Sequence, residues 1–318
     1  MSTNLKVAFL MDPLEKLDLK GDTSFALALE AQERGHTIHH FTPDALILRS
    51  NKVLANICKF ELVIENEINK YKYYDKNVQL LSDFDIVLMR QDPPFDMSYI
   101  TATHLLEKLP KKTIIVNNPF EVRNAPEKIF VTNFPHLMPE TLITKDINVI
   151  KSFRDEFQDI VIKPLYGNGG QGVFHLKPND ENFYSILEMF FKQSNEPLMI
   201  QKYLKDVRNG DKRIILLNGE IVGALNRVPQ KGESRSNMHV GGKPERTSIT
   251  KRDKFICDEI SQSLKEKGLY FVGIDIIGDF ITEINVTSPT GIREIKINDS
   301  INIEKMFWDF IEDKILTN

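Results

Sequence analysis

A segment near the carboxyl end of the chain, residues 271–294, places acidic residues inside apolar runs and most constrains the fold. It reads FVGIDIIGDFITEINVTSPTGIRE, and the Gly-Asp pair between its two apolar runs predicts a β-hairpin. Asp275, Glu283 and Asn285 stand among Ile and Val in these runs. A carboxylate is costly to bury unless a partner neutralises it, and a divalent cation with oxygen ligands is one such partner. The hairpin therefore predicts a metal site.

Two further observations bear on this hairpin. Glu283 and Asn285 are two residues apart, so they share one face of an extended strand, and Asp275 can join them from across the hairpin. An ordinary edge hairpin with its acids in solvent is the alternative. The chain continues after Asn285 into a polar loop suited to holding a small anion beside a metal, formed by Thr287, Ser288, Pro289, Thr290, Gly291 and Arg293.

Composition excludes several classes of protein. The chain has 318 residues, 41% hydrophobic and 27% charged, which is typical of a globular protein of two or three joined modules. A net charge of -4 and a pI near 6.0 give no reason to expect nucleic acid or an anionic membrane as a partner. Cys58 and Cys257 lack metal-binding spacing and indicate free thiols in a reducing compartment. The apolar run before Asp12 is too short for a signal peptide or a membrane span, and we expect it to form a buried first strand.

The first part of the chain reads as a parallel α/β module. A strand at 6–11, a helix at 23–34 capped by Asp22, and a strand at 37–41 form a β-α-β unit. Residues 45–80 are interpreted as an inserted hairpin or meander. A buried strand at 84–89 then delivers Arg90 and Asp92 into the loop RQDPPFD, and α/β sheets bind ligands beyond such strand ends. A solvated turn with charges is the alternative for this loop.

A glycine-rich loop, PLYGNGGQG, marks the middle of the chain. It lies between predicted strands at 159–163 and 173–176, and a predicted helix at 126–134 carries Lys128 upstream of it. The glycines match G-x-G-x-x-G, but a dinucleotide-binding fingerprint needs a helix after them, and no Walker A Lys-Ser/Thr pair follows. We expect a hairpin tip whose backbone N–H groups cover a polyphosphate, next to an inward-facing Lys163. A flexible surface hairpin is the alternative.

Further polar positions follow in the last third of the chain. Gln201 to Leu204 leave a predicted strand at 198–203, in the kind of hinge where adenine pairs with main chain. Asp211 and Arg213 open a strand that folds back at an Asn-Gly turn. The polar segment PQKGESRSNMHVGG, within 228–242, is either disordered or a lid that closes during turnover. Helices are predicted at 250–267 and 302–316.

Taken together, these motifs resemble the bacterial glutathione synthetase family of the ATP-grasp superfamily. The resemblance spans nearly the whole chain and is most specific where VGIDIIGDFITEINVTSPTGIRE is combined with RQDPPFD. It implies an α/β fold in three parts: a Rossmann-like α/β domain over 1–120 that binds substrate, a central domain with the glycine hairpin over 121–204, and a catalytic sheet domain over 205–318 that clasps ATP.

The resemblance also implies the chemistry and the partners. The reaction is ATP-dependent joining of γ-glutamylcysteine and glycine through an acyl phosphate, giving glutathione, ADP and phosphate. Mg²⁺ is the expected cofactor, with two ions and with Mn²⁺ as a substitute. The expected assembly is a cytoplasmic homotetramer.

Residue roles follow from the same resemblance. Arg213 and Arg235 correspond to catalytic arginines, and Asp275, Glu283 and Asn285 to metal ligands. The positions implied to bind ATP are Lys128, Lys163, Gly167, Asn168, Gly169, Gly170, Gln201, Lys202, Tyr203, Leu204 and Asp211. Those implied to bind the peptide and glycine are Arg90, Asp92, Arg235, Ser288, Thr290 and Arg293.

The lid departs from the pattern of the family. Family members commonly carry small residues where this chain has Ser236, His239 and Val240. Two alternatives stay open at this point. Another ATP-grasp ligase would share the lysines and metal ligands but should lack RQDPPFD and SPTGIRE, and a non-catalytic nucleotide-binding protein should have lost the metal ligands or arginines.

Overall fold

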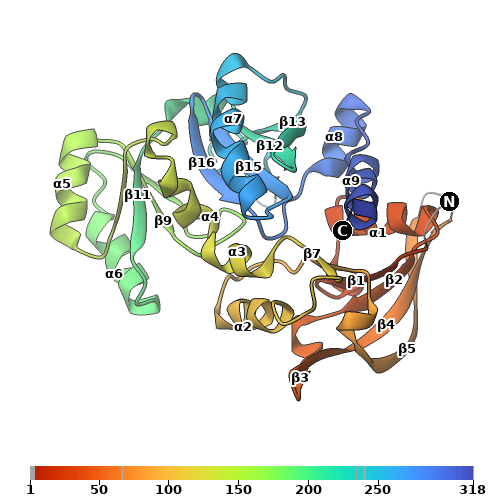
Figure 1. The fold of residues 1–318 in the computed structure, drawn as a ribbon. Helices are drawn as coiled ribbons and strands as arrows, with labels where there is room; N and C mark the ends of the chain where they lie inside the picture. Colours follow the sequence, from red (N-terminus) through yellow and green to blue (C-terminus); the bar gives the residue numbers. More distant parts are fainter. Residues whose placement is uncertain (1–3, 66–67, 234, 239–240, 318) are drawn as a thin grey trace.

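The fold is built on three β-sheets, shown in Figure 1 from red at the start of the chain to blue at its end. The structure is a computed structural model and describes residues 4–65, 68–233, 235–238 and 241–317. No helix in these ranges is long and apolar enough to cross a membrane.

The first sheet has a parallel centre, as the β-α-β pattern predicts. Its order is β3-β4-β2-β1-β6-β7, with β5 paired to β4. Strands β1, β2, β6 and β7 run parallel, and all but the first residue of β1 is buried, because helices cover central parallel strands. The elements of this part are β1 (Lys6–Leu10), α1 (Thr23–Glu33), β2 (Thr37–Phe41), β3 (Leu46–Arg49), β4 (Lys52–Glu65), β5 (Ile68–Leu80), β6 (Ile86–Met89), α2 (Met97–Leu106), β7 (Ile114–Val116) and α3 (Pro119–Asn124).

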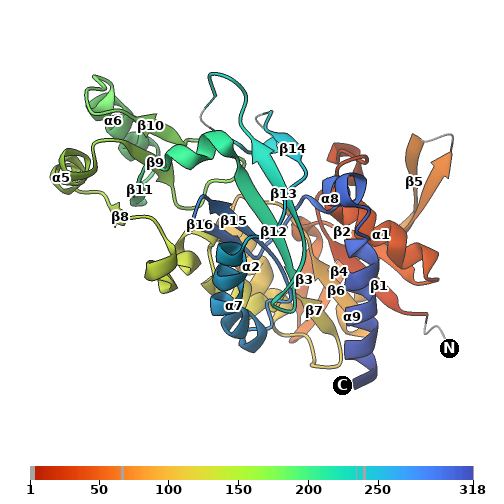
Figure 2. The ribbon, with the colours of Figure 1, turned by 90° about the horizontal axis from the view of Figure 1, so that it is seen from above.

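The segment that sequence patterns placed least well, 45–80, is a long antiparallel hairpin. Strands β4 and β5 pair along most of their length and β3 pairs with the other edge of β4. The prediction of a hairpin or meander is confirmed. In Figure 2 this hairpin extends to one side of the molecule, away from the other two sheets.

The second sheet has its own small core. It is antiparallel, in the order β10-β9-β11-β8, and α5 and α6 pack apolar side chains such as Ile150 and Leu187 with those of the strands. The predicted return strand after the glycine loop is confirmed, since β10 pairs with β9. The predicted helix at 126–134 is α-helical only in its first turn, α4. The elements are α4 (Glu127–Phe130), β8 (Thr141–Thr144), α5 (Ile147–Phe157), β9 (Ile160–Pro164), β10 (Phe174–Leu176), α6 (Phe183–Gln193) and β11 (Leu198–Lys202).

The third sheet contains both predicted hairpins. Its order is β14-β13-β12-β15-β16, all antiparallel, and Asn218 and Gly219 at one turn both have positive φ, as a tight two-residue hairpin requires. The interpretation of SPTGIRE as loop throughout is wrong, because a helix begins at Ile292 and includes Arg293. The elements are β12 (Asp211–Leu217), β13 (Glu220–Val228), β14 (Lys243–Glu245), α7 (Lys251–Glu266), β15 (Phe271–Ile277), β16 (Phe280–Asn285), α8 (Ile292–Asp299) and α9 (Ile303–Thr317).

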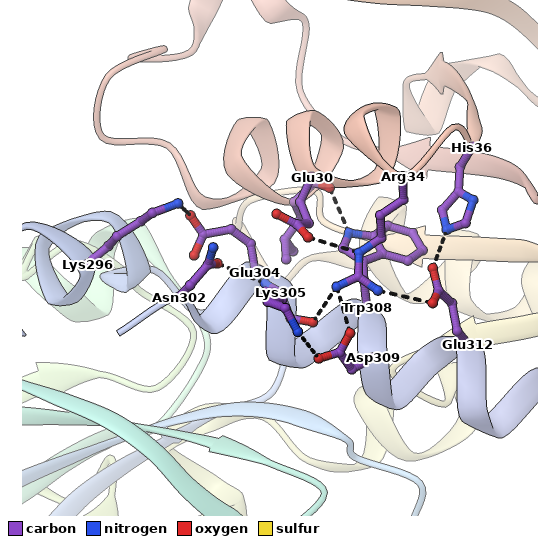
Figure 3. A network of polar contacts seen from close by, with 11 residues as sticks. Glu30, Arg34, His36, Lys296, Asn302, Glu304, Lys305, Trp308, Asp309 and Glu312 are labelled. Carbon is purple, nitrogen blue, oxygen red and sulfur yellow. Dashed lines mark hydrogen bonds and ion pairs between the residues drawn. The ribbon is translucent and has the colours of Figure 1, made fainter. Parts of the chain in front are cut away.

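The last helix, α9, packs against the first helix, α1 (Figures 1 and 2). Trp308 is completely buried there and its indole N–H donates to the Leu27 carbonyl at 2.8 Å. Figure 3 shows Arg34 of the same interface reaching across to α9, where its guanidinium donates to Asp309 at 2.8 Å and Glu312 at 3.1 Å. One apolar core therefore joins the start of the chain to its end.

Removing the indole from this shared core should destabilise the protein strongly. We expect Trp308→Ala to lower the free energy of unfolding by about 3–5 kcal/mol, because a large buried aromatic group is deleted and the Leu27 carbonyl loses its donor. Urea unfolding followed by circular dichroism measures this. Leu316→Ala is the control, since Leu316 lies on the same helix but is 73% exposed; equal midpoints for both variants would contradict the packing described.

The first sheet should also lose stability in acid through its histidines. Burial, followed by the charge of Lys6, lowers the pKa of His39 to about 4, and burial also lowers the pKa values of His36 and His40. The folded state thus binds fewer protons than the unfolded state, whose histidines have pKa values near 6.5. The contribution of these neutral histidines to the free energy of unfolding is therefore complete above pH 6.5 and is lost as the pH falls toward 4.

The urea midpoint, measured from pH 7 to pH 4, should therefore fall, and it should fall less in His39→Phe than in wild type. His136→Gln serves as the control because that ring is largely exposed on the surface. An identical pH dependence in wild type and His39→Phe would show that His39 does not carry the effect.

Candidate active site

A cavity of about 560 Å³ lies where residues of all three sheets meet. Among its walls are the loop after β6, the glycine-rich loop after β9, the start of β12 and the inner face of the β15–β16 hairpin. Of the residues that the family resemblance assigns to catalysis, ATP, substrates or metal, all except Arg90 and Arg293 line this cavity. Their roles stay predictions, but the chain does bring them together.

The β15–β16 hairpin places its acids on adjacent strands. Asp275 of β15 stands opposite Glu283 of β16 in the strand register. Asp275 is held by two guanidinium groups, with Arg213 donating at 2.9 Å and Arg227 lying at 3.0 Å. Burial alone would raise the pKa of Asp275, but the two arginines outweigh it and hold that pKa well below its usual range. The arginines therefore favour the ionised form of Asp275.

The two predicted phosphate lysines converge on Glu283. The ammonium of Lys128 lies 3.3 Å from the Glu283 carboxylate and that of Lys163 lies 3.8 Å away. Burial works against both charges. Neighbouring acids outweigh it at Lys128, whose pKa is raised, whereas burial dominates at Lys163, whose pKa is lowered. The site thus holds two buried lysine side chains beside a half-buried carboxylate.

The glycine-rich loop and the lid segment lie against each other. Gly169 and Gly170 both adopt positive φ, a conformation that side chains disfavour. Lys128 donates to the Gly167 carbonyl at 2.7 Å, and Arg235 of the lid segment donates to the Gly170 carbonyl at 3.3 Å. The lid segment therefore touches the loop that is predicted to cover phosphate.

Within the lid segment, Ser236 is tied to the third sheet. Its side chain is buried and donates to a carboxylate oxygen of Asp211 at 2.8 Å, and Arg227 donates to the same carboxylate at 2.6 Å. Of the three departures from the family pattern, Ser236 thus has a structural role. His239 and Val240 lie outside the described residues.

The predicted adenine hinge lies at the end of β11. Gln201 is buried and its amide donates to the Thr141 hydroxyl at 2.9 Å. Tyr203 stacks on His175 with ring centroids 3.7 Å apart and 9° between the planes. His175 lines the cavity as well, and its contact with Tyr203 gives this end of the cavity flat, apolar surface beside main chain.

The two segments predicted to bind the peptide and glycine meet across the first and third sheets. The Ser288 hydroxyl donates to Asp92 at 2.7 Å, and Arg213 donates to the Thr290 carbonyl at 3.4 Å. Arg90 is buried behind them and donates to Ser24 at 3.1 Å and to the Pro289 carbonyl at 3.0 Å. Arg90 therefore supports the loop, whereas Asp92 and Ser288 face the cavity.

Arg293 has a different environment from the one implied for it. It lies in the first turn of α8, and its guanidinium donates to the Lys20 carbonyl at 3.0 Å. In this arrangement it connects α8 to the loop after β1, next to the cavity but outside its walls.

Glu127 and Arg227 are among the cavity residues that sequence reasoning missed. Glu127 directly precedes Lys128, accepts from the Thr287 hydroxyl at 3.1 Å, and has its pKa raised to about 7 mainly by burial. Arg227 lies near the end of β13 and bridges Asp211 and Asp275. Adjacency to Lys128 was the available signal for Glu127; for Arg227 it was the pairing of β13 with β12.

Family models match almost the whole chain. Residues 5–123 match the model described as prokaryotic glutathione synthetase, N-terminal domain, and residues 127–300 match prokaryotic glutathione synthetase, ATP-grasp domain. The chain belongs to the prokaryotic glutathione synthetase family. It is therefore an ATP-dependent ligase.

Curated relatives agree with this membership. A protein named glutathione synthetase from Brucella melitensis is 58% identical, covering 97% of this chain and 98% of its own length. One from Mesorhizobium japonicum is 56% identical over 98% of this chain and 99% of its own, and one from Coxiella burnetii is 40% identical over 99% and 98%.

Solved structures support the fold. D-cycloserine synthetase DcsG matches with a TM-score of 0.68 at 12% identity, over 96% of this chain and 99% of that one. An ATP-grasp ligase from Chryseobacterium gregarium, in complex with ADP and a leader and core peptide, matches with a TM-score of 0.63 at 15% identity, over 98% and 97%. At these identities the match shows that the fold is ATP-grasp.

The buried carboxylate of Asp275 should be important for stability independently of any ligand. We expect Asp275→Asn to lower the free energy of unfolding by about 3–5 kcal/mol, because it leaves two buried guanidinium groups without their shared counter-charge. Chemical unfolding in the absence of nucleotide and metal measures this. Asp279→Asn, at the exposed turn of the same hairpin, should change stability by no more than about 0.5 kcal/mol. A loss no larger in Asp275→Asn than in that control would contradict the charge arrangement.

Proposed function

We propose that this protein joins γ-glutamylcysteine to glycine at the expense of ATP, giving glutathione, ADP and phosphate in the final step of glutathione synthesis. The observation that carries the proposal is the convergence of Lys128, Lys163 and Arg213 on the acidic β15–β16 hairpin, within one cavity of a chain of this family. This set of charges suits phosphoryl transfer to a carboxylate.

The first chemical step activates the substrate. A free carboxylate does not accept an amine because an oxide is a poor leaving group. Transfer of the γ-phosphoryl group from ATP to the cysteinyl carboxylate oxygen breaks the bond to ADP and forms an acyl phosphate. Lys128 and Lys163 neutralise charge on the transferred group, and the backbone N–H groups of Gly167 to Gly170 cover it.

Nucleotide binding is assigned to both sides of the cavity. The hinge at the end of β11 contacts adenine, and a carboxylate at the start of β12 accepts from the ribose hydroxyls. The residues involved are Gln201, Lys202, Tyr203, Leu204 and Asp211. The flat surface of Tyr203 stacked on His175 is consistent with an aromatic base at this end.

The chain's oxygen donors fit Mg²⁺, which prefers hard oxygen ligands. Asp275, Glu283 and Asn285 would hold it, and the lowered pKa of Asp275 keeps that carboxylate ionised for binding. In the part of the chain that the structure describes, no three His, Cys, Asp or Glu side chains are grouped as a metal site. When bound, the metal neutralises charge on the β- and γ-phosphates. We expect two ions and replacement by Mn²⁺.

The second step forms the peptide bond. The amine of glycine attacks the acyl carbon, the C–N bond forms, and the bond to phosphate breaks. Arg213 stabilises the oxygens of the acyl phosphate, and Arg235 in the lid segment contacts the same region. The residues assigned to bind the peptide and the glycine carboxylate are Arg90, Asp92, Arg235, Ser288, Thr290 and Arg293. Of these, Arg90 contributes by supporting the loop that carries Ser288 and Thr290.

The lid segment protects the intermediate. An acyl phosphate hydrolyses if water reaches it, so residues 228–242 must close over the cavity before transfer. The contacts of Arg235 with the glycine-rich loop and of Ser236 with Asp211 support a closing position for the described part of this segment.

The setting of the reaction follows from the family. We place it in the cytoplasm, in keeping with two free, buried cysteines, and propose a homotetramer as the assembly.

Product formation tests the proposal. Phosphate release from ATP and Mg²⁺ should require both γ-glutamylcysteine and glycine, and mass spectrometry should detect the tripeptide. Glu283→Gln should lower the rate at least about 100-fold, since it removes a charge on which both lysines and the metal depend. Glu259→Gln, at an exposed position of α7, is the matched control.

Two outcomes would contradict the proposal in different ways. Turnover with another carboxylate and amine, but not with this pair, would keep the ligase chemistry and reject the substrate. Full activity of Glu283→Gln would reject the assigned site.

A further inference from the structure

The side-chain amide of Asn285 has two possible orientations, which exchange its oxygen and nitrogen. The neighbouring groups favour one of them. With its nitrogen toward Asp275, the amide makes one contact at 3.5 Å and turns its oxygen toward the carboxylate of Glu127. With the nitrogen toward Glu127, it donates to both carboxylate oxygens at 3.2 Å each. Two donations to the Glu127 carboxylate outweigh one contact at the limit of hydrogen-bond distance, and they remove the amide oxygen that otherwise faces this carboxylate at 3.2 Å. The second placement is therefore the one adopted.

This placement has a consequence for the opposite end of the amide. Its oxygen now lies on the side of Asp275, and a cation bound between these two oxygen atoms would stabilise the arrangement. The arrangement agrees with a metal ligand that binds through oxygen, because the amide nitrogen cannot bind a cation and needs an acceptor of its own.

Glu127 is well placed to be that acceptor. Its carboxylate also accepts from the buried hydroxyl of Thr287 at 3.1 Å, which limits its rotation. It begins α4 beside Lys128, and that helix packs against β16, the strand that carries Asn285. The packing of α4 against β16 thus holds the Asn285 amide next to the Glu127 carboxylate.

We propose that Glu127 is a positioning residue, which fixes the amide nitrogen of Asn285 so that the amide oxygen faces the cation. The inference rests on the proposed metal site. Ligands of a metal are commonly oriented by such outer contacts, whose loss costs 10–100-fold in metal affinity or activity. Glu127 itself does not touch the reacting atoms.

Binding of Mn²⁺ to the full-length protein with ADP, followed by electron paramagnetic resonance, tests the proposal without turnover. Glu127→Gln should weaken Mn²⁺ binding about 10–100-fold, because one of the two oxygen atoms that accept from Asn285 becomes an amide nitrogen, which cannot accept. Metal-free ADP binding should stay unchanged; a parallel loss there would mean that Glu127 acts through Lys128 and would overturn the proposal. Glu121→Gln removes a carboxylate of similar setting on nearby α3 and should bind Mn²⁺ like wild type.

A double variant makes the test specific. Asn285→Asp should weaken Mn²⁺ binding when Glu127 is present, since two carboxylates then face each other. In the Glu127→Gln background the same change should strengthen binding about 10-fold or more, because the new amide donates to the introduced carboxylate. An equal effect of Asn285→Asp in both backgrounds would overturn the proposal.

Glu283→Gln separates this inference from the metal site on which it rests. If Glu283→Gln abolishes Mn²⁺ binding while Glu127→Gln leaves it intact, the site stands and the positioning role fails. If Glu283→Gln binds Mn²⁺ like wild type, the assigned metal site itself is wrong, and the positioning role falls with it.

Discussion

The buried pairing of arginines with aspartates at the base of the cavity is the interaction on which the rest of the site depends. Arg227 contacts both Asp211 and Asp275, and Arg213 contacts Asp275 as well. Isolated charges at this depth would cost far more free energy than a fold can supply, so these groups persist only as a set. The two arginines hold the pKa of the buried Asp275 carboxyl well below its usual range, which favours its ionised form. An ionised carboxylate is the form that binds a cation.

The same pairing also organises the surrounding elements. Asp211 begins β12, Asp275 lies on β15, and the two arginines come from neighbouring strands, so the charges are spaced by the ladder of one sheet. The lid segment reaches this group through Ser236, and the first sheet reaches the adjoining loop through Asp92 and Ser288. The lid segment and the loop after β6 therefore both contact the third sheet or the loop that follows it.

Much of this could be predicted from sequence, because the patterns involved are local. The Asn218-Gly219 turn, the Asp22 cap and the glycine-rich hairpin each depend on a few adjacent residues, and all three are present. Contacts between residues far apart in the sequence could not be predicted from such local patterns. Glu127 reads as an ordinary helix-start acid until β16 brings Asn285 against it, and SPTGIRE looks like loop because the pattern of α8 emerges only when Ile292 and Ile295 become buried.

The packing of α9 on α1 affects the order in which the apolar cores of this protein can form. The core that holds Phe9 and Leu27 also contains Phe307 and Trp308. During synthesis the first sheet is made before α9, yet the apolar surface that it shares with α9 can be covered only after α9 has left the ribosome. Until then that surface remains exposed to chaperones and to other chains. The second sheet, with a core built from residues 142–200, can close much earlier. Cores in this molecule are therefore completed in an order different from the order in which they are encoded.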